Sequence, residues 1–167
     1  IYPDKIAEKA VGAIGKYYGI TMQGCGTISD LLEKGAKAGV SKYLVHSTAT
    51  KPEQVKPIHD FISQSISDYD CFTGFGTLHP DMENIEEEVN RMILLGIKGV
   101  KMHPEFQEFY LDEDKMMPLY KSLEGKLPLL VHMGDKQKSS SSPARLVKIL
   151  NKFPKLLVIA AHLGGYS

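Results

Sequence analysis

The chain has 167 residues, which is enough to bury one substantial core and suggests a single domain over residues 1–167. Its 20 Lys and Arg balance its 20 Asp and Glu, so net charge gives no reason to expect nucleic acid or an anionic membrane surface as a partner. The longest apolar run, residues 156–161, is far shorter than the roughly 20 residues that a transmembrane helix needs.

The two cysteines, Cys25 and Cys71, form neither a CxxC motif nor a disulfide-rich pattern. This usage indicates a reducing, cytoplasmic setting, and we expect both to be small buried residues. A small molecule is the expected binding partner, and the sequence leaves open whether the chain forms a homo-oligomer.

Short apolar segments of strand type alternate along the chain with helical patterns. The predicted strands are 43–46, 72–78, 99–102, 129–132 and 157–162, and the predicted helices are 27–38, 54–66, 84–95 and a last one starting at Pro143. Ser29 or Asp30 can cap the first of these helices, and Ser142 can cap the last. Strands that alternate with helices in this way predict an α/β fold with parallel strands joined by helical crossovers.

A weak internal repeat supports this organisation. Residues 38–46 resemble residues 95–103: each segment ends a helix at a glycine, enters a strand and finishes on a histidine.

Five of the six histidines lie where predicted strands end. They are His46, His79, His103, His132 and His162, whereas His59 falls within a helix and is expected to be a surface or packing residue. The carboxyl ends of parallel strands lie on one face of the sheet, so the five imidazoles should converge there. Any one of them could be structural, but the set favours metal binding and proton transfer, because neutral imidazole is a common zinc ligand and titrates near neutrality.

Three segments with strand-end histidines carry a family resemblance. They read GIKGVKMHP at 96–104, LVHMG at 130–134 and AAHLGG at 160–165. With them the chain resembles the amidohydrolase superfamily, in particular the branch that includes aminocarboxymuconate-semialdehyde decarboxylase. The resemblance implies a (β/α)8 TIM-barrel fold in which a first-strand HxH pair, a strand-five His and a strand-eight Asp hold one divalent metal ion, usually Zn2+, and a strand-six His contacts the metal-bound water or the substrate.

Carried over residue by residue, the resemblance makes His132 a metal ligand and His162 the catalytic histidine. The first residues look like the segment after the HxH strand, and residues 164–167 look like the start of the helix after strand six. We therefore expect an incomplete TIM barrel holding about strands two to six, without its first strand and its last two β/α units.

Lys101 and His103 are candidates for binding a substrate carboxylate or carbonyl, although a solvent-facing pair at a strand end explains them as well. A strand-four lysine bridges two metals in other branches of the superfamily, but not in this one, so a single metal ion is expected.

The resulting hypothesis is a metal-dependent hydrolase that uses a metal-activated water on an amide, ester or lactone carbonyl. Non-hydrolytic decarboxylation of an aromatic or muconate-type acid is an enzymatic alternative. A catalytically silent α/β binding module is an alternative of a different class.

Overall fold

The structure is a computed structural model, and it describes residues 1–135 and 138–165. Residues 164–167 were expected to begin the helix after strand six, and the last two of them, 166–167, lie outside the described residues. The elements in chain order are α1 (Asp4–Tyr18), α2 (Ile28–Lys37), β1 (Tyr43–Val45), α3 (Val55–Asp68), β2 (Phe72–Gly74), α4 (Ile85–Leu94), β3 (Val100–Met102), α5 (Met117–Leu123), β4 (Leu129–Val131), α6 (Pro143–Lys152) and β5 (Val158–Ala160). Short 3-10 turns cover Pro52–Gln54, Asp114–Met116 and His162–Gly164.

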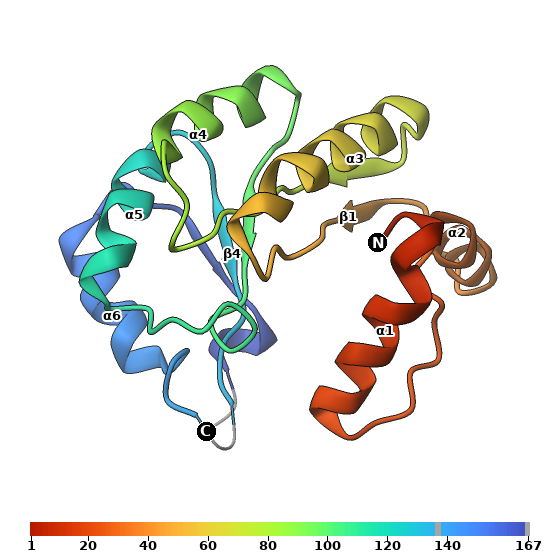
Figure 1. The fold of residues 1–167 in the computed structure, drawn as a ribbon, viewed down its shortest axis with the longest axis horizontal. Helices are drawn as coiled ribbons and strands as arrows, with labels where there is room; N and C mark the ends of the chain where they lie inside the picture. Colours follow the sequence, from red (N-terminus) through yellow and green to blue (C-terminus); the bar gives the residue numbers. More distant parts are fainter. Residues whose placement is uncertain (136–137, 166–167) are drawn as a thin grey trace.

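The described strands pair in parallel and in sequence order. β1 pairs with β2, while β3, β4 and β5 form a second sheet, and a parallel bridge between Gly76 and Val100 links the two groups. One helix connects each strand to the next, and α3 to α6 form an open arc outside the strands, with α1 and α2 on the β1 side (Figure 1). The predicted α/β class with parallel strands is thereby confirmed.

Burial is deepest at the middle of this array. All three residues of β3 are buried, and so are Leu129 and Val131 of β4, whereas β5 is only partly buried. The outer strands instead expose apolar side chains, including Leu44 and Ile159. The carboxyl ends of β3 and β4 therefore offer the most rigid platform for a site.

Local signals explain most of the element boundaries. Gly39 and Gly96 both have a positive φ, which lets the chain leave α2 and α4 in the left-handed conformation that the internal repeat predicts. Pro143 begins α6 as predicted, although the Ser142 side chain makes no capping bond. The cap of α2 is Thr27, whose Oγ1 accepts from the Asp30 N–H at 3.2 Å, so the predicted cap at Ser29 or Asp30 is wrong by a few residues.

Two helices were not predicted, and the burial expected of both cysteines is wrong. Helix α1 was missed because its inward positions are small residues such as Ala7 and Gly15, which give a weak apolar pattern. Helix α5 was missed because it has only 7 residues. Cys25 is exposed and Cys71 only partly buried, so the expectation that both are buried is wrong. In the part of the chain that the structure describes, no helix is long and apolar enough to cross a membrane.

Candidate metal centre

The backbone of His103 is fixed where the chain leaves β3. Its N–H donates to Gln107 Oε1 at 2.8 Å, and Gln107 Nε2 donates to the carbonyls of Ala49 at 2.8 Å and Leu78 at 2.7 Å. Those two carbonyls belong to the segments that follow β1 and β2. The buried Gln107 side chain therefore ties the ends of three strands together and sets the position of His103.

The His103 ring is held between two other rings. It stacks on Phe106 at 3.9 Å between centroids and on His132 at 3.9 Å, with interplanar angles of 6° and 13°. Its Nε2 lies 3.0 Å from the Tyr18 hydroxyl of α1. Burial is the main cause that lowers the pKa of His103, so this imidazole is neutral at pH 7 and suited to binding a cation.

Glu105 brings a buried carboxylate to the same place. Its Oε1 accepts from Ser140 Oγ at 2.8 Å and from Ser141 Oγ at 2.5 Å. Burial alone would raise the pKa of this carboxyl, but the nearby His103 and the two hydroxyls outweigh burial and lower the pKa to about 2. Glu105 is therefore an anion at neutral pH.

Two atoms of this pair have no hydrogen-bond partner among the described residues. Glu105 Oε2 and His103 Nδ1 lie 3.3 Å apart, and both are buried without a hydrogen bond. Burying an unpartnered polar atom is costly, so such atoms call for a ligand. One donor atom each from His103, Glu105 and His132 lies within 4.8 Å of the others. Two nitrogens and a carboxylate oxygen are a donor set that zinc accepts, so these residues fit a divalent cation.

His132 and His162 are brought together as expected from adjacent strand ends. His162 Nε2 lies 3.2 Å from His132 Nδ1, and the two rings meet edge to face at 4.7 Å between centroids. Burial, followed by the charges of His103 and Lys101, lowers the pKa of His132 to about 4. His162 is exposed and adopts a positive φ of 55°, which turns the chain sharply just after β5.

Lys101 is buried beside this group rather than facing solvent. Its Nζ donates to the Met102 carbonyl at 3.0 Å, and burial lowers its pKa to about 8. The predicted alternative of a solvent-facing pair is wrong, because both Lys101 and His103 are only 6% exposed.

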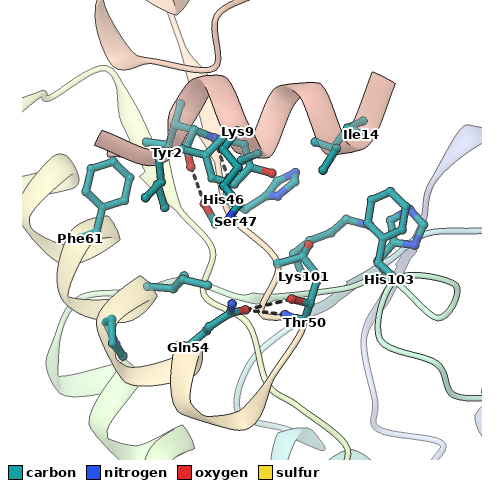
Figure 2. Close-up of a pocket in the computed structure, with 18 of the residues that line it drawn as sticks. Tyr2, Lys9, Ile14, His46, Ser47, Thr50, Gln54, Phe61, Lys101 and His103 are labelled. Carbon is teal, nitrogen blue, oxygen red and sulfur yellow. Dashed lines mark hydrogen bonds between the residues drawn. The ribbon is translucent and has the colours of Figure 1, made fainter. Parts of the chain in front are cut away.

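A pocket of about 850 Å³ opens onto these residues. Lys101, His103 and Glu105 are among its lining residues, and α1 and α3 contribute apolar walls through residues such as Ile14 and Phe61 (Figure 2). His46 also lines it, and burial is the main cause that lowers the pKa of His46 to about 3. The size is that of a small-molecule site.

The remaining histidines lie outside the group. His79 is buried and accepts from the Asp81 N–H at 3.2 Å. His59 is completely buried and bonds Glu88, so it is a packing residue and not a surface one. Three of the five predicted imidazoles are therefore in direct ring contact, and His46 lines the adjoining pocket.

The sequence patterns did not identify Glu105, Ser140 or Ser141 as residues of the site. A signal for them exists, because Glu105 follows the strand-end histidine by two residues and Ser140 and Ser141 belong to the one serine-rich tract of the chain. Neither signal shows that the two segments meet, since that depends on β3 and β4 being neighbours.

Comparison with known proteins agrees with this geometry. A family model described as amidohydrolase matches residues 30–167. The chain belongs to the amidohydrolase family. None of the curated proteins searched matches it.

A solved structure shares the fold of this amidohydrolase. It is that of a probable 2-pyrone-4,6-dicarboxylic acid hydrolase from Acinetobacter baumannii with citric acid bound, with a TM-score of 0.54 and 13% identity. The match covers 80% of this chain but only 46% of the other, so the chain spans about half the length of that protein. The predicted TIM-barrel type of fold, present in part, and the predicted superfamily are thereby confirmed.

Proposed function

We propose that this amidohydrolase is a metal-dependent hydrolase of a small molecule that carries an amide, ester or lactone carbonyl, and that its metal ion is Zn2+. The observation that supports this most strongly is a pair of buried atoms without a hydrogen bond, His103 Nδ1 and Glu105 Oε2, which face each other at 3.3 Å beside the His132 ring.

His132 is proposed as a metal ligand, as the family resemblance implies, and His103 and Glu105 are proposed as further ligands. This replaces the predicted role of His103 in substrate binding, because the His103 ring is enclosed by Phe106 and His132. When bound, a divalent cation would supply Lewis-acid activation of water and of the substrate carbonyl.

His162 is proposed to move the proton. Its Nε2 contacts His132, and its exposed ring can reach a substrate and exchange protons with solvent. Lys101 is proposed to bind a carboxylate or carbonyl oxygen of the substrate, because its buried ammonium lines the pocket and donates to a neutral acceptor, the Met102 carbonyl. The apolar walls from α1 and α3 would exclude water from the substrate body.

The test is turnover of the zinc-loaded protein on a panel of small lactones and aryl esters. We expect zinc-dependent hydrolysis, and a fall in kcat of about 10²- to 10⁴-fold in His162→Asn with zinc binding retained. His79→Asn, a histidine outside the group, serves as the matched control. Release of CO2 without hydrolysis would indicate the decarboxylase alternative, and protein that neither binds zinc nor turns over substrate would indicate the binding module.

A further inference from the structure

The serine tract at 139–142 links β4 to α6, and its residues differ sharply in exposure. Ser140 and Ser141 are buried, Ser139 is exposed, and Ser142 is the residue before the first turn of α6. The tract is therefore not a uniform solvent loop, because its middle faces the interior.

The two buried hydroxyls act on one oxygen of one carboxylate. Each hydroxyl has a single proton to donate, and both donate to Glu105 Oε1, at 2.8 Å from Ser140 and 2.5 Å from Ser141. The second oxygen, Oε2, is left facing His103 Nδ1. The serines thus determine which carboxylate oxygen remains available.

The backbone holds the two serines in place. The Ser140 carbonyl accepts from the Leu111 N–H and the Ser141 carbonyl accepts from the Gly134 N–H, each at 3.1 Å. Leu111 is buried in the core, and Gly134 follows His132 by two residues. The hydroxyls are therefore presented from a segment anchored to both the core and the His132 loop.

We propose that Ser140 and Ser141 are positioning residues for the metal ion: by occupying Glu105 Oε1 they direct Oε2, with His103 Nδ1, toward the cation. The inference rests on the proposed function, because it assumes that this group holds a divalent cation. Groups that hydrogen-bond a ligating carboxylate orient it and tune affinity, and removing them typically costs about 10- to 100-fold in metal binding.

A purely structural role for the serines has a different signature. Hydroxyls that only satisfied a buried charge would affect folding and leave metal affinity unchanged. Reciprocal coupling separates the two roles, because a ligand that depends on the serine segment must in turn stabilise that segment.

The experiment measures Zn2+ affinity by competition with a chelator, using the whole chain and temperatures at which circular dichroism shows each variant folded. Ser140→Ala/Ser141→Ala should bind zinc about 10- to 100-fold more weakly, and Ser139→Ala should match the wild type. Glu105→Gln, which keeps an acceptor for both hydroxyls, should lose at least as much affinity as the double variant. Zinc should also slow amide hydrogen exchange at 138–142 in the wild type and not in Glu105→Gln.

Three outcomes would count against the inference in distinguishable ways. Zinc affinity equal to wild type in the double serine variant would overturn the positioning role and leave the proposed function standing. Zinc affinity equal to wild type in Glu105→Gln would overturn the role of Glu105 as a metal ligand. Absence of zinc binding by the wild type would overturn the proposed metal-dependent function and the inference with it.

Discussion

Two buried His–Glu pairs lie among the described residues, and they are built differently. Between α3 and α4, His59 Nδ1 meets Glu88 Oε1 at 2.6 Å, His59 Nε2 meets the Thr77 carbonyl at 2.7 Å, and Arg91 donates to the same Glu88 oxygen at 2.9 Å. At the ends of β3 and β4, His103 and Glu105 approach only to 3.3 Å.

The difference lies in which buried atoms lack a hydrogen bond. No atom of His59 or Glu88 is among the buried atoms without a hydrogen bond in the described residues, whereas His103 Nδ1 and Glu105 Oε2 both are. Identical residue types therefore serve two purposes. The first pair closes on itself and stabilises the fold, and the second leaves two donor atoms for a ligand.

The largest expected effect concerns the stability of the closed pair. Glu88→Ala leaves the buried His59 Nδ1 without its carboxylate partner and removes one of the two carboxylates that Arg91 contacts, the other being Asp60, so the free energy of unfolding should fall by about 3 kcal/mol. Urea denaturation measures this change. The matched control is Glu87→Ala, an exposed neighbour on α4, which should change stability by less than about 1 kcal/mol. Zinc affinity should be unaltered in both variants. A loss of zinc binding in Glu88→Ala would contradict the claim that the His59–Glu88 pair is structural and only the His103–Glu105 pair binds metal.

A smaller effect is expected in the pH dependence of zinc affinity and of stability. Because the pKa of His132 is lowered to about 4, its imidazole stays neutral and able to bind metal well below the ordinary histidine value of about 6.5. The unfolded chain takes up that proton first, so the stability of the metal-free protein should fall as pH drops from about 6.5 toward 4. Equilibrium dialysis should give nearly constant zinc affinity from pH 7 to 5.5, after correction for the buffer. A steep loss centred near 6.5 would show that one of the two proposed histidine ligands, His132 or His103, titrates as an exposed histidine does.

The smallest expected effect is on zinc affinity, and it identifies which nitrogen of His103 binds the metal ion. Tyr18→Phe removes the hydroxyl from Nε2 and leaves Nδ1 untouched, so zinc affinity should change by no more than about twofold, at the low end of what one partly buried hydrogen bond contributes. Chelator competition resolves such a change. A rise of tenfold or more would mean that the phenol competes with the metal for Nε2, and would move the ligand atom to that side of the ring.

Local sequence signals account for much of the fold. Strands β1 and β4 and helices α2 and α6 were predicted because apolar periodicity, and Pro143 at the start of α6, act over a few residues, whereas the side-chain caps were not predicted correctly. The contact between His132 and His162 was also predictable, since parallel strands place successive strand ends side by side.

The rest depends on contacts between distant segments. Ser140 and Ser141 meet Glu105 across 35 and 36 residues of chain, so no local pattern reveals that the serine tract faces a carboxylate. The two His–Glu pairs were equally hidden. His59 lies in a helical pattern that gives no sign of Glu88, and the burial of both follows from the packing of α3 and α4 against the strands.

The most direct test of the metal centre is the zinc affinity and stoichiometry of the wild type compared with His132→Ala, with Glu88→Ala as the reference for a pair outside the site. The account predicts about one zinc ion per chain in the wild type and in Glu88→Ala, and a loss of affinity of about 100-fold or more in His132→Ala. Zinc bound equally by the wild type and His132→Ala would contradict it.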